Sequence, residues 1–306
     1  MTTLQSPKVS IITPSYNQGQ FIEETIQSVL GQDYPNIEYL IVDGGSNDNT
    51  IDILKQYLGR LKWISEKDKG QADAINKGIK KTSGEIVCWL NSDDTILPGA
   101  VSKAVNLFVS NPEIKLVYGK SYFTDQEGNI NGSYPTEKFD FQRLAMFNFI
   151  SQPSVFFKRD AYDKVGGLNA QLNYSLDYDL WIKIGKEFQT KYLEKYLSCY
   201  RLHESSKTVD KNQALHSHKE GIAVVYSHYG WVPANRLYGY YRHLLESKGI
   251  TLLKFIKPLE ILIVLILTLL TYLRINRSIC PADIKYLRWK NIRKLRADWS
   301  KPDKIY

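Results

Sequence analysis

Strand-like and helix-like segments alternate along the first 120 residues, and this order most constrains the fold. Short apolar runs predict strands at 9–12, 37–42, 61–64, 86–90 and 116–118. Helical spacing of apolar residues between them predicts helices at 21–30, 71–79 and 98–109, and a turn at 46–48 begins another that runs through Leu58. The alternation predicts an α/β protein with a mostly parallel, Rossmann-like sheet covered by helices. Ligands bind beyond the carboxyl ends of such strands, so the residues that follow them are the first candidates for a site.

The second half of the chain is less regular. We expect a hairpin around 125–129, a strand at 154–157, and helices at 176–188, 210–229 and 232–245, with His216 and His218 on a helix surface. The three cysteines are far apart, which argues against a disulfide framework and a thiolate zinc site. No apolar signal region opens the chain, so we expect the folded part to stay in the cytoplasm. The predicted division is a domain at 1–208, a helical extension at 209–248 and a membrane-associating segment at 249–306.

The last third of the chain combines an apolar run with a basic tail. The uncharged run 261–273 is shorter than the roughly 20 residues that span a bilayer, so a core helix remains an alternative to a membrane helix. Beyond it, an amphipathic pattern places five apolar residues on one helix side, namely Ile284, Leu287, Ile292, Leu295 and Trp299. From Arg274 onward ten Lys or Arg face three Asp or Glu, and the rest of the chain is about neutral. This pattern favours an anionic membrane surface rather than nucleic acid, and predicts peripheral or monotopic association with the inner face of the cell membrane.

The turn Asn91-Ser92-Asp93-Asp94 directly follows the buried strand predicted at 86–90. Two adjacent carboxylates repel each other unless a cation lies beside them, and hard oxygen ligands suit Mg²⁺ or Mn²⁺. A cation held there can in turn hold a phosphorylated substrate. The alternative is an ordinary strand-ending turn, in which Asn, Ser and Asp are common.

Six different motifs follow one another along the chain, each at a predicted strand or helix. They are Lys8–Asn17, Val42–Thr50, Ser65–Gly78, Asn91–Asp94, Leu176–Trp181 and Tyr200–Thr208. The sequence has no GxGxxG and no GxSxG, which weakens a dinucleotide-binding and a hydrolase interpretation. The series resembles the family 2 glycosyltransferases of bacterial polysaccharide and O-antigen synthesis, over roughly residues 8–208. That resemblance implies the GT-A fold and transfer of a sugar from a nucleotide diphosphate with inversion.

The resemblance implies a donor site built by the first three motifs. In that donor site, Thr13, Pro14, Ser15 and Tyr16 would line the nucleotide pocket, and Asp43 would contact the base. Glu66, Lys69, Gly70 and Asp73 would lie beneath the ribose and the diphosphate. The base is usually uracil, which Asp43 would read by accepting its ring N–H. Asp43 is alternatively a turn or capping residue, and Asp73 an ordinary acid of a helix's first turn.

The resemblance also implies the metal site and the catalytic base. Asn91, Ser92 and Asp93 match the family's DxD, with Asp93 as the Mn²⁺ or Mg²⁺ ligand and His203 on the metal or diphosphate. Asn91 departs from the usual Asp, and Asp94 either supports the metal ligand or faces the acceptor. Asp177 matches the family's catalytic base. In the family motif a Glu usually precedes this Asp, whereas here the preceding residue is Leu176.

We therefore expect an inverting transfer from a nucleotide sugar, with uridine favoured by Asp43, to a hydroxyl of a glycan or lipid-linked acceptor. The apolar run and the basic tail motivate the lipid-linked acceptor. Two alternatives remain open, a non-catalytic nucleotide-sugar or glycan-binding module and a sugar nucleotidyltransferase. The paired Asp93 and Asp177 disfavour the first, and the lack of a glycine-rich basic loop after the first strand disfavours the second.

Overall fold

A computed structural model describes residues 6–204, 206, 211–248 and 257–286. The chain divides into two compact units. The first, here the sheet unit, comprises Met1–Phe141 and Asn148–His203. The second, here the helical unit, comprises Gln142–Phe147 and Glu204–Tyr306. The predicted boundaries at 208 and 248 stay a prediction.

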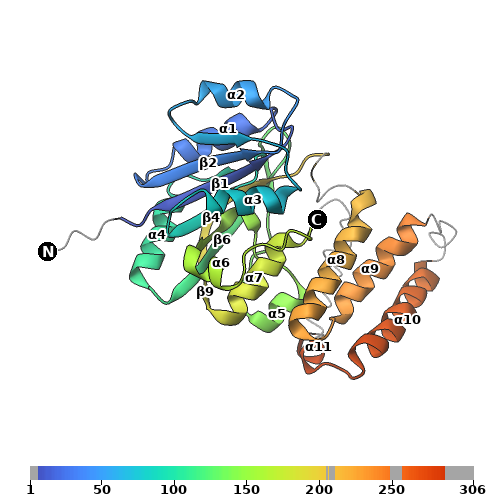
Figure 1. The fold of residues 1–306 in the computed structure, drawn as a ribbon. Helices are drawn as coiled ribbons and strands as arrows, with labels where there is room; N and C mark the ends of the chain where they lie inside the picture. The colour runs from blue at the N-terminus through green and yellow to red at the C-terminus, as the bar shows by residue number, and fades with distance from the viewer. Residues whose placement is uncertain (1–5, 205, 207–210, 249–256, 287–306) are drawn as a thin grey trace. The chain divides into compact units, whose positions relative to one another are not determined.

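A nine-stranded sheet forms the sheet unit, in the order β3-β2-β1-β4-β8-β6-β9-β5, with β7 paired to β6 (Figure 1). The strands are β1 (Val9–Ser15), β2 (Ile37–Asp43), β3 (Lys62–Ser65), β4 (Ile86–Trp89), β5 (Thr95–Ile96), β6 (Ile114–Thr124), β7 (Ile130–Ser133), β8 (Val155–Lys158) and β9 (Gln189–Arg201). The pairings among β3, β2, β1 and β4 are parallel, whereas β8 is antiparallel to both of its neighbours. The α/β prediction is confirmed, and so is the hairpin between β6 and β7.

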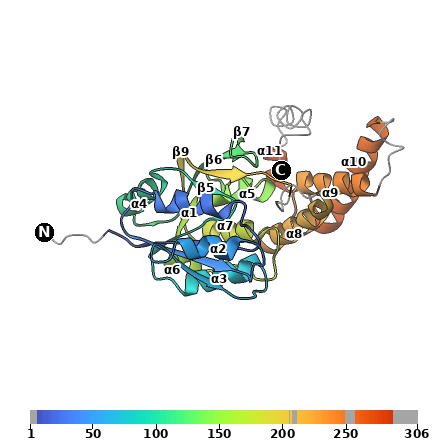
Figure 2. The same cartoon turned by 90° about the horizontal axis from the view of Figure 1, so that it is seen from above.

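Helices cover both sides of the sheet because neighbouring residues of its strands point to opposite faces. Ile11 of β1 packs with Ile22 and Ile26 in the buried apolar cluster, whereas Ile12 lies against Gly78 on the other face. The helices on the Ile11 side are α1 (Ile22–Leu30), α2 (Thr50–Gln56) and α4 (Ala100–Ser110). On the Ile12 side they are α3 (Gln71–Lys80), α6 (Arg159–Lys164) and α7 (Leu176–Glu187). Figure 2 shows α1 and α4 on one side and α3 and α6 on the other. The two layers explain why these strands are apolar on both faces.

The helical unit contains a small core and one long apolar helix. Its elements are most of α5 (Phe141–Met146), then α8 (Lys211–Tyr229), α9 (Ala234–Ser247), α10 (Lys257–Asn276) and α11 (Pro281–Tyr286). α9 packs against both α8 and α10 (Figure 1). Val232, Leu237 and Tyr272 are the buried apolar residues of the core. α10 is long and apolar enough to cross a membrane, and only 17% of its apolar stretch is buried, which does not fit the core-helix alternative.

The two histidines predicted on a helix surface, His216 and His218, have different surroundings. His216 is exposed as expected, but the prediction for His218 is wrong, because its Nε2 lies 3.1 Å from Nδ1 of His243 in α9. Burial, together with nearby His243 and Arg236, lowers the pKa of His218 to about 4. The amphipathic pattern beyond Ile284 lies outside the described residues.

Candidate active site

The carboxyl ends of β1, β2 and β4 bring three of the predicted motifs to one edge of the sheet. Ser15 pairs in register with Asp43, and Ile12 pairs with Trp89, two residues before Asn91. Thr13 is buried and its hydroxyl lies 3.1 Å from that of Tyr39. Motifs that are far apart in the sequence therefore line one edge, as the strand order predicted.

Asp43 is fully buried and organises the turn after β2. Its Oδ2 accepts hydrogen bonds from the amides of Gly45 (3.0 Å) and Ser46 (2.9 Å) and from the Ser65 hydroxyl (2.7 Å). Its Oδ1 accepts the Ser46 hydroxyl at 2.5 Å. A carboxylate has about four acceptor positions, and these four hydrogen bonds fill them. The turn role expected as an alternative is present, and base recognition by Asp43 stays a prediction.

The loop after β1 is fixed to the loop after β2. The Asn17 amide donates to the Ser46 hydroxyl (2.7 Å), and the Asn47 amide donates to Oδ1 of Asn17 (3.0 Å). Asn17 adopts φ 52°, a left-handed conformation that Asn tolerates better than most residues. This arrangement leaves Tyr16 58% exposed and buries Ser15, whose hydroxyl has no hydrogen-bond partner among the described residues. A buried hydroxyl without a partner fits a position that a ligand completes.

The segment after β3 is held by the start of α3. Asp73 accepts the Lys69 amide at 3.0 Å and pairs with Lys77 at 3.2 Å, so the expected first-turn role of this acid is present. The Lys69 N–H is the main reason that the pKa of Asp73 is lowered. Glu66 also pairs with Lys77, at 3.2 Å. Gly70 has φ 110° and open space around its Cα. A ligand can approach the backbone closely at such a position.

Asn91 is the centre of an amide network at the end of β4. Its Oδ1 accepts from Gln71 at 2.8 Å, and its Nδ2 donates to Gln152 at 3.0 Å and to Asp94 at 3.3 Å. Gln152 in turn donates to the Trp89 carbonyl at 2.8 Å. The network holds the turn in one conformation and uses both ends of the Asn91 amide.

Asp93 and His203 meet at this turn although 110 residues separate them. Oδ2 of Asp93 lies 3.1 Å from Nε2 of His203, and the imidazole is buried. A carboxylate oxygen beside an imidazole nitrogen is a donor pair that suits Mn²⁺. Residues 6–204, 206, 211–248 and 257–286 include no group of three or more His, Cys, Asp or Glu placed to hold a metal. The pair therefore fits a cation whose remaining ligands come from a bound diphosphate or water.

Arg201 of β9 holds this part of the site together, and we did not predict it. Its amide donates to Oδ1 of Asp94 at 2.9 Å, and its Nε donates to the Asp93 carbonyl at 2.9 Å. Nη1 donates to the Gln126 carbonyl at 2.7 Å, and Nη2 pairs with Glu24. The guanidinium also lies over the ring of Phe21, which packs on His203 with ring centroids 4.5 Å apart. The one feature of the sequence that could have indicated a role for Arg201 is its position two residues before His203.

Asp94 is buried beneath the turn rather than facing out of it. It is 1% exposed, and burial, reinforced by neighbouring Asp93, raises its pKa well above the usual range. The hydrogen bonds from the Arg201 amide and from Asn91 oppose that rise. These contacts support the expected role behind the metal ligand more than a role facing the acceptor.

Asp177 occupies the first turn of α7 and is half-buried. Trp181, four residues later and so on the same side of the helix, stacks on Trp89 with ring centroids 5.5 Å apart. Trp89 ends the strand that leads into Asn91–Asp94, so this contact fixes the helix that carries Asp177 to that strand. Asp179 is instead buried and pairs with Lys183 at 2.7 Å.

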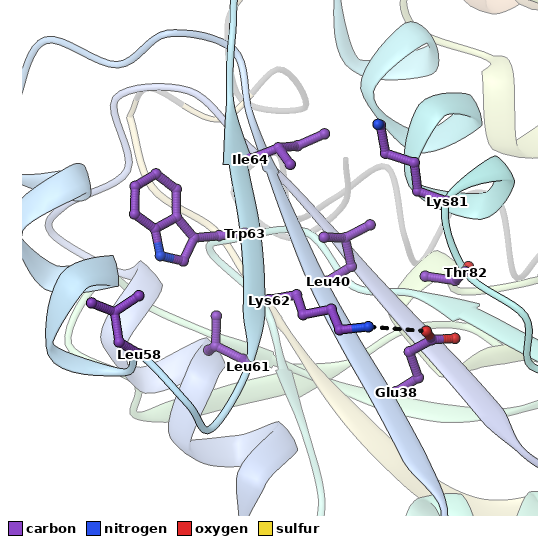
Figure 3. Close-up of a pocket in the computed structure, with 9 residues that line it drawn as sticks. All are labelled: Glu38, Leu40, Leu58, Leu61, Lys62, Trp63, Ile64, Lys81 and Thr82. Carbon is purple, nitrogen blue, oxygen red and sulfur yellow. Dashed lines mark ion pairs between the residues drawn. The ribbon is translucent and has the colours of Figure 1, made fainter.

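A separate hollow of about 610 Å³ lies around the edge strand β3 (Figure 3). Trp63 and Ile64 point to opposite sides of the strand, and Lys62 pairs with Glu38 at 3.8 Å. Glu38 precedes Asp43 by five residues, which is roughly 17 Å along a strand. The hollow contains none of the predicted site residues.

The family model "Glycosyl transferase family 2" matches residues 10–166, half of the chain. An uncharacterized glycosyltransferase from Rickettsia typhi is 31% identical over 229 residues, which are 70% of this chain and 69% of that protein. The chain belongs to glycosyl transferase family 2. The predicted resemblance is confirmed, and this family 2 protein is a glycosyltransferase.

Two further relatives are polysaccharide synthases. The chondroitin synthase of Escherichia coli is 29% identical over 216 residues, and the hyaluronan synthase of Pasteurella multocida 28% identical over 211. These matches cover 69% and 67% of this chain but only 31% and 21% of the two synthases.

The fold agrees with solved glycosyltransferase structures. S. aureus TarS 1–349 in complex with UDP-GlcNAc superposes with a TM-score of 0.59 at 18% identity, over 80% of this chain and 75% of that one. The mannosyltransferase PcManGT from Pyrobaculum calidifontis, in complex with GDP-Man and Mn²⁺, gives a TM-score of 0.60 at 16% identity, over 98% and 82%. The family 2 chain thus has the predicted GT-A fold.

Proposed function

We propose that this glycosyltransferase moves a sugar from a nucleotide-diphosphate donor, a UDP-sugar, to a hydroxyl of a glycan or lipid-linked acceptor, with inversion at the anomeric carbon. The observation that carries the proposal is the meeting of Asp93 and His203 at the carboxyl end of β4. Trp181 fixes α7, and with it Asp177, to the same strand. A donor-side and an acceptor-side group are then supplied by separate elements.

Asp93 and His203 are the residues that would hold Mn²⁺ or Mg²⁺. A divalent cation bound there would offset the negative charge that develops on the departing diphosphate. Arg201 and Asn91 contribute by fixing the backbone of the turn, so that the Asp93 carboxylate keeps its position.

Asp177 acts on the acceptor in this proposal. Its carboxylate takes the proton of the acceptor hydroxyl as that oxygen attacks the anomeric carbon, which is general base catalysis. The bond between the anomeric carbon and the diphosphate oxygen breaks on the opposite face, and the nucleoside diphosphate leaves with the bonding electrons. One displacement from the opposite face inverts the configuration.

Two structural neighbours bound to different nucleotides, UDP-GlcNAc on TarS and GDP-Man on PcManGT, support a nucleotide-sugar donor without choosing the base. The choice of uracil follows from the match of Asp43 to the family's base-reading residue. The apolar α10 and the basic residues after it support an acceptor at the inner face of the cell membrane.

The test is incubation of the full chain with a panel of nucleotide sugars, Mn²⁺ and a membrane extract as the source of acceptor. We expect release of free nucleoside diphosphate with one donor. Conversion of the nucleotide sugar and added pyrophosphate into nucleoside triphosphate and sugar 1-phosphate would identify a nucleotidyltransferase instead. Tight donor binding without turnover would identify a binding module, and either result refutes the proposal.

A further inference from the structure

α10 has one covered side and one uncovered side. Val264, Thr268 and Tyr272, spaced four apart, are 1%, 6% and 5% exposed. On the opposite side, six large apolar side chains are between 46% and 61% exposed, namely Leu262, Leu265, Ile266, Leu269, Leu270 and Leu273. We call these six the outer face of α10. A contiguous apolar surface of this kind marks an interaction site in a folded protein.

The covered side of α10 is fixed to polar partners in the helical unit. The Tyr241 hydroxyl of α9 lies 2.6 Å from that of Thr271. Asn276 accepts the Val232 amide and donates to the Val232 carbonyl, both at 2.8 Å. The Tyr272 hydroxyl accepts the Cys280 amide at 2.8 Å. α10 is therefore one layer of a packed unit and not an isolated helix.

These contacts decide between lying in a bilayer and crossing it. α9 packs along α10 and carries charged residues, among them Arg236 and the ion pair of Arg242 with Glu246 at 3.1 Å. If α10 crossed a bilayer, either α9 would enter the hydrocarbon with its charges, or the two helices would separate and expose Thr268, Thr271 and Asn276 to lipid. Both are unfavourable.

The charge next to the outer face identifies the surface that covers it. Arg274 and Arg277 lie directly after the apolar stretch, and the sequence from Arg274 onward has ten basic against three acidic residues. The remainder of the chain is about neutral, so this charge is local. Basic residues beside an exposed apolar helix are complementary to anionic lipid headgroups.

We propose that the helical unit docks on an anionic lipid surface with α10 lying in one leaflet, outer face down, and with both ends of the helix on the same side of the bilayer. The inference deepens the membrane part of the proposed function and rests on it. The outer face enters roughly 5–10 Å, to the boundary between headgroups and acyl chains.

Flotation of the full chain with preformed vesicles tests the docking. We expect binding to phosphatidylglycerol-containing vesicles and at least tenfold weaker binding to pure phosphatidylcholine. The double variant Leu262→Glu, Leu269→Glu should lose at least tenfold in binding. Leu58→Glu is the matched control, because Leu58 is 67% exposed in the sheet unit, and it should bind as the unsubstituted chain does. Unchanged binding by the double variant overturns the proposal.

Thiol labelling tests the orientation. Glu260→Cys and Ser278→Cys place a thiol near each end of α10, and labelling is counted above that of the three native cysteines. With an impermeant maleimide outside the vesicles, both sites should react to the same extent before and after detergent. Protection of one end until detergent is added means that α10 crosses, which overturns the proposal. Self-association through the outer face without lipid binding, abolished by the double variant, would assign the face to a second copy of the chain and also overturn it.

Donor turnover with a soluble acceptor, measured without vesicles, separates this inference from the proposed function. If only the membrane docking is wrong, turnover persists while flotation fails. If the proposed chemistry is wrong, flotation persists while no donor is consumed.

Discussion

The sheet unit and the helical unit treat polar and apolar side chains in opposite ways. In the sheet unit the carboxylates near the strand ends are buried and already hydrogen-bonded, as Asp43 and Asp94 are, and most large apolar residues are inside. In the helical unit the core is small, and the outer face of α10 remains uncovered. The comparison shows that the same residues stabilise the sheet unit and form its candidate site. The helical unit instead exposes apolar surface suited to a partner.

The largest effect on turnover should come from replacing the proposed catalytic base. Asp177→Asn removes the proton acceptor, so we expect turnover to fall by about 10²- to 10⁴-fold while the Kd for the nucleotide is unchanged. Diphosphate release and a nucleotide titration measure the two quantities. Asp179→Asn is the control: it breaks the pair with Lys183, so it should lower the Tm while leaving turnover of the folded protein near wild type. Wild-type turnover in Asp177→Asn would remove Asp177 from the mechanism.

Arg201 tests whether stability and chemistry share residues in the sheet unit. Arg201→Met leaves the Asp93 and Gln126 carbonyls and Glu24 without their donor, and should lower the free energy of unfolding by about 3 kcal/mol. It should also weaken Mn²⁺-dependent nucleotide binding, because Asp93 and His203 lose their support.

Arg159→Met provides the comparison for Arg201. Arg159 also donates to buried carbonyls, those of Gly84 (2.7 Å) and Ile79 (2.6 Å), but it is remote from the turn. We expect a similar loss of stability and normal nucleotide binding. If both variants affect binding equally, Arg201 has no special relation to the site.

Asp93→Ala should raise the Kd of a nucleoside diphosphate about tenfold or more in Mn²⁺, which is about 1.4 kcal/mol. In chelator the variant and the wild type should bind alike. Asp52→Ala, at a 76% exposed side chain, should change neither value. A titration calorimeter measures both conditions, and equal affinities in Mn²⁺ would exclude Asp93 as a metal ligand.

The smallest effect concerns the acid stability of the helical unit. The folded pKa of His218, about 4, is below its unfolded value near 6.5, so between these pH values the unfolded state binds more protons. The stabilisation is complete above pH 6.5 and is lost as the pH falls toward 4, by at most about 1.4 kcal/mol per pH unit. Urea unfolding at pH 7 and pH 5 should show this slope in the wild type and in His216→Gln, but a shallower one in His218→Gln. An equal dependence of stability on pH in all three proteins would contradict the lowered pKa of His218.

Much of the fold followed from periodicity. β1, β2 and β4 were predictable because each contains a short, largely apolar run and is followed by turn residues. β9 was not, because its exposed Lys191, Glu194 and Lys195 interrupt any alternation. The full length of α10 was also missed, since the charge of Glu260 ends the uncharged run while the helix continues through it.

The site was predictable to the extent that strand order determines it. Asp43, Asp93 and the first-strand motif lie at the same end of the sheet because the carboxyl ends of parallel strands lie there together. Arg201 was not predictable, because Glu24, Asp93 and Gln126 reach it from three distant segments. The saturation of Asp43 by its own turn is likewise invisible in the sequence.

The central claim is a single displacement assisted by Asp177. Proton NMR of the product formed from an α-linked donor such as UDP-GlcNAc measures it most directly, because the coupling of the new anomeric proton reports the configuration. We predict a β linkage from the wild type and no product from Asp177→Asn. An α linkage would contradict the account.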